Sequence, residues 1–149
     1  MKAIQITILA AAIGFTGAAA ASDRTPMTVF KTPWCGCCHA WTEIMRAEGF
    51  DVTVRDVEDL DPVKKQAGVA DQLQSCHTAV AGDYVIEGHV PPAAVDKLLS
   101  ERPAVRGISV PGMPAGSPGM GDEPSARYTV YSFSHDQGKP PQVYLEVGK

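Results

Sequence analysis

Residues 34–39 read Trp34-Cys35-Gly36-Cys37-Cys38-His39 and contain three of the chain's four cysteines. The apolar run Met27-Thr28-Val29-Phe30 precedes this stretch, and an amphipathic run from residue 40 to 48 follows it. The pattern predicts a strand, a tight turn that carries the cysteines, and a helix that begins at the last of them. Because a helix N-terminus favours thiolate over thiol, we expect lowered pKa values for the three cysteines of the turn.

The next part of the chain predicts alternating helices and strands. We expect a strand over 50–57, a helix over 62–67 with Asp61 as its N-cap, a hairpin of strands 78–81 and 84–87 around Gly82-Asp83, and a helix from Pro92 to residue 102. The order β-α-β-α-β-β-α is that of the thioredoxin fold. It predicts an α/β domain with a mixed four-stranded sheet and helices on both faces.

Two further segments extend this predicted domain towards the C-terminus. Residues 110–124 are dense in glycine and proline and include Met113 and Met120, which predicts an irregular loop of the kind that often has a function. Residues 127–134 and 142–147 predict a C-terminal β-hairpin. No internal repeat is evident, so we expect one domain.

The N-terminus has the pattern of a secretory signal peptide. Lys2 is followed by an apolar stretch over 4–15 and by small residues over 18–21, which predicts a signal peptide over 1–21 and a single mature domain over 22–149. The apolar run is short for a bilayer span, although a membrane anchor is the alternative. We expect a secreted or periplasmic protein with no membrane attachment after cleavage.

The charge balance excludes one class of partner. The chain has 13 basic and 17 acidic residues and a formal charge of −4, which becomes −5 when Lys2 is removed. It contains no basic block or stripe, so we do not expect nucleic acid as a partner.

Four cysteines in an oxidising compartment would ordinarily indicate two structural disulfides. A disulfide between the neighbours Cys37 and Cys38 would be strained, and one between Cys35 and Cys38 closes too small a loop to add much stability. The spacing therefore favours chemistry, with Cys35 and Cys38 as the candidate catalytic pair that cycles between dithiol and disulfide.

The predicted fold brings the fourth cysteine to the same place. The strand after the second helix would begin beside the cysteine turn, so we expect Cys76 to join the other three and His89 to lie nearby. Thioredoxin-like oxidoreductases have a cis-proline at this strand start, where this chain has Ser75-Cys76-His77, and this difference weakens a plain oxidoreductase interpretation. We expect His77 to point away from Cys76 and to be a hydrogen-bonding residue, because neighbours on a strand face opposite sides.

A cluster of thiolates suits soft metal ions such as Cu(I) or Zn(II). Thioether sulfur is a good ligand for Cu(I) and a poor one for zinc, so Met113 and Met120 favour copper, unless they only fill space in the loop. The candidate metal ligands are Cys35, Cys37, Cys38, Cys76, Met113, Met120 and His89. His39 and His135 are expected in solvent.

Several separated motifs resemble one bacterial family. The motifs are Cys35-Gly36-Cys37-Cys38, residues 75–79 (SCHTA), residues 86–91 (IEGHVP), residues 110–114 (VPGMP) and residues 116–120 (GSPGM). They are similar to those of the periplasmic copper-resistance family of CopG type, formerly filed as a domain of unknown function. The resemblance covers nearly all of the mature chain and is weakest in the C-terminal hairpin. It implies a thioredoxin-like fold, a periplasmic location and copper handling by the cysteines, with a redox role toward copper.

Three hypotheses follow for the function. The first is a periplasmic copper-binding protein in copper resistance, holding one or several Cu(I) ions and exchanging them with other copper-handling proteins. The second is a thiol–disulfide oxidoreductase that acts on periplasmic proteins. The third is a structural module stabilised by zinc.

Overall fold

The computed structural model describes residues 25–148. The signal peptide predicted for residues 1–21 lies outside the described residues. Within them, no helix has the length and apolar character that crossing a bilayer requires.

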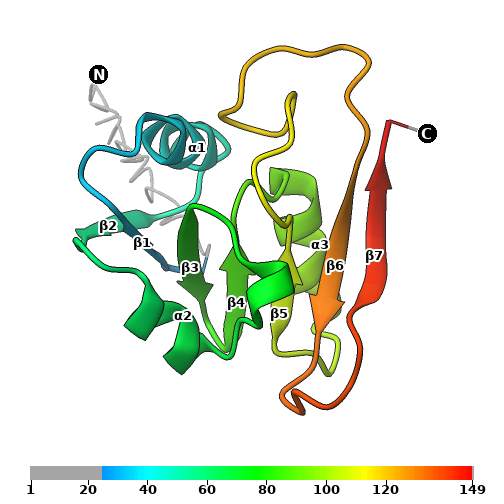
Figure 1. Ribbon diagram of the computed structural model, residues 1–149. Coiled ribbons are helices and arrows are strands. Elements are labelled where there is room, and N and C mark those ends of the chain that lie inside the picture. The colour runs from blue at the N-terminus through cyan, green and yellow to red at the C-terminus, as the bar shows by residue number, and fades with distance from the viewer. Residues whose placement is uncertain (1–24, 149) are drawn as a thin grey trace, which may run out of the picture.

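The strands of the described residues form one mixed sheet in the order β2-β1-β3-β4-β5-β6-β7 (Figure 1). The β1–β2 and β4–β5 pairs are parallel and the other four pairs are antiparallel. The strands are β1 (Met27–Lys31), β2 (Val52–Asp56), β3 (His77–Ala81), β4 (Tyr84–Glu87), β5 (Gly107–Ser109), β6 (Tyr128–Phe133) and β7 (Gln142–Val147).

The prediction of a four-stranded sheet is wrong, because the sheet has seven strands. Strand β5 pairs with β4 on one side and with β6 on the other, so the C-terminal hairpin continues the same sheet. Three residues are too few to show a strand pattern in the sequence. Gly107 is required there, because a Cβ would collide with the backbone of Val85.

The helices are α1 (Gly36–Ala47), α2 (Asp61–Ala67), the 3₁₀ turn η1 (Asp71–Leu73) and α3 (Pro92–Glu101). The predicted N-cap of α2 is wrong by one residue: Leu60 holds that position, and Asp61 lies in the first turn. The carboxylate of Asp59 instead accepts a hydrogen bond from the N–H of Asp61, at 2.9 Å. The predicted end of α2 is confirmed, because Gly68 adopts the left-handed conformation that follows a helix.

Helices cover both faces of the sheet. Trp41 and Met45 of α1 and Leu98 of α3 pack in one cluster with Ile86 of the sheet. The neighbouring Val85 faces the other side of the sheet and packs in a second cluster. The buried members of that cluster are Ala67, Val69, Leu73, Val85 and Phe133. Each large apolar side chain buried in this way contributes about 1.5–3 kcal/mol.

The irregular segment after β5 runs beyond the ends of the strands and comes beside α1 before it enters β6 (Figure 1). It contains no helix or strand from residue 110 to 127, as the glycine and proline content predicts. At Gly119 it packs so closely on the first turn of α1 that an added Cβ would lie 2.7 Å from the Cys37 carbonyl oxygen and 2.9 Å from the Trp41 nitrogen. The loop therefore closes over the cysteine turn.

Candidate metal and thiol site

The turn between β1 and α1 places three sulfur atoms at the start of the helix. Cys35 is the N-cap of α1, and its sulfur accepts a hydrogen bond from the Cys38 N–H at 3.3 Å. A side chain at this position satisfies one of the unpaired N–H groups of the first turn. Cys37 and Cys38 follow within that turn, so the helix start fixes all three.

Cys35 and Cys38 are joined by a disulfide, with their Cα atoms 5.3 Å apart. Cys37 and Cys76 are free thiols, and both are half-buried. The structure therefore shows the oxidised form of the pair that the spacing assigns to redox chemistry.

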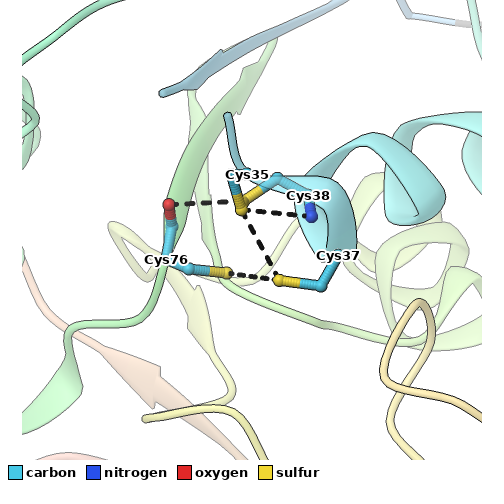
Figure 2. Close-up of side chains that lie close together, drawn as sticks. All are labelled: Cys35, Cys37, Cys38 and Cys76. Atoms are coloured by element: carbon cyan, nitrogen blue, oxygen red, sulfur yellow. Dashed lines mark hydrogen bonds between the residues drawn. A yellow bond between two sulfur atoms is a disulfide. The ribbon is translucent and has the colours of Figure 1, made fainter. Parts of the chain in front are cut away.

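Cys76 joins the three cysteines of the turn, as predicted (Figure 2). Its sulfur lies 3.9 Å from that of Cys37, which in turn lies 3.5 Å from that of Cys35. The four sulfur atoms all lie within 4.8 Å of one another, close enough to hold a metal ion together. A gap of nearly forty residues in the sequence is closed by the pairing of β1 with β3.

A buried ion pair fixes the chain around Cys76. Lys64 of α2 donates to Glu87 of β4 at 2.5 Å, and both side chains are almost completely buried. The same carboxylate accepts from the Ser75 N–H at 2.7 Å and from the Thr78 hydroxyl at 2.6 Å, which fixes the residues on either side of Cys76 and His77. Burial raises the pKa of Glu87, and Lys64 opposes that rise.

We did not predict this ion pair. Its only signal in the sequence is a single acidic residue at the end of the otherwise apolar strand Tyr84-Val85-Ile86-Glu87. Its partner is a lysine on a helix with two lysines in succession, Lys64 and Lys65, and only the fold decides which one is buried.

The loop after β5 is tied to the same segment. The Ser75 hydroxyl donates to the carbonyl of Gly112, and the N–H of Gly112 donates to the carbonyl of Gln74 at 2.9 Å. The segment before β3 is thus held by Glu87 on one side and by the loop on the other.

His89 lies against Cys76, as expected from the hairpin. Its ring is buried, with Nδ1 2.7 Å from the carbonyl oxygen of Pro118 and Nε2 2.9 Å from the Cys76 sulfur. A carbonyl can only accept, so Nδ1 carries the proton and the lone pair of Nε2 faces the sulfur. Burial lowers the pKa of His89. Burial, and then the neighbouring Cys37, raises the pKa of Cys76 to about 12.

The expectation that His77 points away from Cys76 is wrong. Its Nδ1 lies 3.5 Å from the Cys76 sulfur, and its ring packs on Trp41 at 4.5 Å and edge-on to His89 at 5.1 Å. Cys76 precedes β3, so the alternation of a strand does not apply to the pair. Burial lowers the pKa of His77 well below 6.5. His39 and His135 are exposed, as predicted.

Comparison with known proteins identifies the family. A solved structure described as "Copper resistance protein copG- Form 1" matches 85% of this chain and 100% of its own, with 36% sequence identity and a TM-score of 0.77. A second, "Form 2" of the same description, matches 83% of this chain and 98% of its own, with 37% identity and the same TM-score. The chain belongs to the CopG family.

A sequence model of the family described as "Protein of unknown function, DUF411" matches residues 73–120. That range contains Cys76, Glu87, His89 and both loop methionines, but not the cysteine turn. No curated protein matches the chain by sequence.

The two methionines are placed differently in this CopG-family structure. Met113 is 55% exposed, and it follows the glycine that binds the Ser75 segment. Met120 is half-buried, and it follows the glycine that packs on the first turn of α1. Both therefore flank the cysteine site, and their role as ligands remains a prediction.

The chemistry of the site depends on the state of the disulfide. In the oxidised form, Cys37 and Cys76 supply two thiols beside His77 and His89, and Cys76 and the two histidines form a second group that could hold a metal ion. Reduction by two electrons adds the sulfurs of Cys35 and Cys38. Thiolate and imidazole donors suit Cu(I) and Zn(II) and do not suit Mg²⁺ or Ca²⁺.

Proposed function

We propose that this protein binds Cu(I) in copper resistance, through the reduced thiolates of Cys35, Cys37, Cys38 and Cys76. The observation that carries the proposal is the convergence of Cys76 on the cysteine turn, with four sulfurs within 4.8 Å of one another. The likeness to solved copper resistance proteins over most of the chain supports copper as the metal. Met113, Met120 and His89 are the further candidate ligands.

The choice of copper over zinc follows from the donors around the thiolates. Thioether sulfur binds Cu(I) well and Zn(II) poorly, and two methionines flank the site. The alternative is a structural zinc ion held by the four cysteines in a closed site. A competition experiment between Cu(I) and Zn(II) distinguishes the two.

The redox pair adds a proposed step to this function. When the Cys35–Cys38 dithiol is oxidised to the disulfide, it releases two electrons, which reduce two Cu(II) ions to Cu(I), and two protons, which pass to solvent. The disulfide at the start of α1, together with the strand order β2-β1-β3-β4, supports a thioredoxin-like origin for this half of the sheet. The signal peptide pattern of residues 1–21 supports action in the periplasm.

Titration of the reduced protein with Cu(I) in anaerobic buffer, with Zn(II) as competitor, tests the proposal. We expect far tighter binding of Cu(I), and we expect Cys76→Ser to lower the affinity or the number of bound ions nearly as much as Cys35→Ser does. His39→Gln, at an exposed position beside the cysteine turn, is the control and should change nothing. Zinc binding at least as tight as that of Cu(I) would overturn the proposal in favour of a structural zinc module.

A thiol–disulfide oxidoreductase is the second candidate, because the structure holds a Cys35–Cys38 disulfide. The surroundings oppose it: none of the described peptide bonds is cis, and Cys76 lies where a substrate peptide would pair. We therefore expect little insulin reduction, and further loss of it with copper. Turnover near that of a thioredoxin, unaffected by copper, would favour this second candidate.

A further inference from the structure

The Cys35–Cys38 disulfide and the two free thiols lie in a row, each sulfur close to the next. From the Cys35–Cys38 disulfide, the next sulfur is that of Cys37, 3.5 Å from Cys35, and the one after it is that of Cys76, 3.9 Å from Cys37 (Figure 2). Two sulfurs at the first of these distances are in van der Waals contact. Thiol–disulfide exchange needs this contact between a free thiolate and a disulfide sulfur.

We propose that Cys37 and Cys76 are a second redox pair, which receives the disulfide from Cys35–Cys38 by exchange inside the protein. The proposal does not rest on copper binding. It gives a function to Cys37 and Cys76, which a plain Cys-x-x-Cys pair does not need. No external oxidant is required, because the existing disulfide supplies the oxidising equivalents.

In the first step, the thiolate of Cys37 attacks the sulfur of Cys35. The Cys37–Cys35 bond forms, the Cys35–Cys38 bond breaks, and the electron pair leaves on Cys38. The released sulfur lies 3.5 Å from the carbonyl oxygen of Cys76. That carbonyl accepts a hydrogen bond from the Cys38 thiol once the sulfur has taken up a proton, so the structure already provides for the reduced form.

In the second step, the sulfur of Cys76 attacks that of Cys37. The Cys76–Cys37 bond forms, the Cys37–Cys35 bond breaks, and the electron pair leaves on Cys35. The Cys76 thiol donates a hydrogen bond to Nε2 of His89, 2.9 Å away, and its proton is lost to solvent as the new S–S bond forms. Cys35 is the N-cap of α1, where the Cys38 N–H and the helix dipole stabilise its negative charge.

The two isomers differ in what they link and what they leave free. A Cys35–Cys38 disulfide lies within one turn and leaves Cys37 and Cys76 as thiols. A Cys37–Cys76 disulfide links α1 to the segment before β3, across 39 residues, and leaves Cys35 and Cys38 as a dithiol. In both isomers the protein is oxidised by two electrons, and two thiols remain.

A non-reducing tryptic map distinguishes the isomers. Trypsin cleaves after Lys31, Arg46, Lys65 and Lys97, so the cysteine turn lies on the peptide 32–46 and Cys76 on the peptide 66–97. A Cys35–Cys38 disulfide stays within the first peptide, whereas a Cys37–Cys76 disulfide joins the two. The full chain is stripped of metal with a chelator, reduced, and oxidised in dilute solution with one equivalent of diamide.

The Cys35–Cys38 isomer is separated in acid, where exchange stops, and returned to neutral buffer without oxidant. Samples are then alkylated and mapped, and circular dichroism confirms that the protein has refolded. We expect the joined peptide to appear at the expense of the internal disulfide, while two thiols per chain remain free.

Cys37→Ser, oxidised in the same way, should show about a tenfold loss of the joined peptide, because the sulfur that carries the exchange is missing. His39→Gln is the control and should behave as the original chain. The proposal is overturned if the returned isomer yields no joined peptide, or if Cys37→Ser yields as much as the original chain. The second result would mean that Cys35 or Cys38 reacts directly with Cys76.

Discussion

Replacing Glu87 with glutamine should destabilise the protein severely, although the two side chains have nearly the same size. The carboxylate is completely buried and accepts three hydrogen bonds, from Lys64, Thr78 and the Ser75 N–H. The amide oxygen of glutamine can keep the bonds to Lys64 and Ser75. The negative charge is lost, and the ammonium of Lys64 stays buried without a counter-ion.

The size of the effect follows from that uncompensated charge. Removing one partner of a buried ion pair costs about 3–5 kcal/mol, whereas replacing both partners with neutral groups of similar volume is often nearly neutral. A domain of this size has a total stability of about 5–15 kcal/mol, so Glu87→Gln should remove a large part of it. Lys64→Met should cost nearly as much, and the double variant should be much closer to the original chain than either single one.

Urea denaturation of the reduced, metal-free protein measures the three variants as a double-mutant cycle. Glu101→Gln is the control, because it breaks the exposed Lys97–Glu101 pair on α3 and should have little effect. A cost below about 1 kcal/mol for Glu87→Gln, or additive costs in the double variant, would refute the reasoning that the buried charge pair holds this part of the fold.

Three further results are expected. Gly119→Ala should cost about 1–3 kcal/mol in urea denaturation, because φ is +87° and the Cβ meets the first turn of α1; Gly112→Ala, at φ +67° with open space, should cost less. Burial lowers the pKa of His77, so the unfolded chain takes up a proton first as the pH falls below 6.5. Stability should be fully present above that pH and decline below it, by at most about 1.4 kcal/mol per unit, and His77→Gln should remove this part of the slope. Met120→Leu should weaken Cu(I) binding in an anaerobic titration and leave stability unchanged; unaltered affinity would exclude the thioether as a ligand.

Elements with strong local signals could be predicted from the sequence. Strand β1 contains the whole apolar run from Met27 to Phe30, as predicted, and the hairpin of β3 and β4 turns at Gly82 as expected. Helix α2 ends at Ala67 as predicted, and Gly68, with its positive φ, follows it. In each case the information lies within a few residues: alternation for a strand, and conformational freedom for a glycine.

Features that depend on distant parts of the chain could not be predicted in the same way. Strand β5 is three residues long and owes its existence to the edges of β4 and β6 that it joins. The partners of Glu87 come from α2 and from the segment before β3, and no periodicity connects them. The predicted orientation of His77 is wrong because its neighbour Cys76 lies just outside the strand. The position of Cys76 beside the cysteine turn follows from the sequence only if the thioredoxin-like strand order is assumed.

The origin of the ligands decides how a bound metal would act on the fold. Cys35, Cys37 and Cys38 belong to one helix start, Cys76 to the segment before β3, and His89 to the segment after β4. The Cys35–Cys38 disulfide links nothing outside a single turn, so it restricts the unfolded chain little. A metal ion shared by the turn and Cys76 ties α1 to the sheet, and binding of this kind adds to the free energy of unfolding. If the metal is lost and the Cys35–Cys38 disulfide forms, α1 is no longer linked to the sheet at this site. A Cys37–Cys76 disulfide would restore that link without metal.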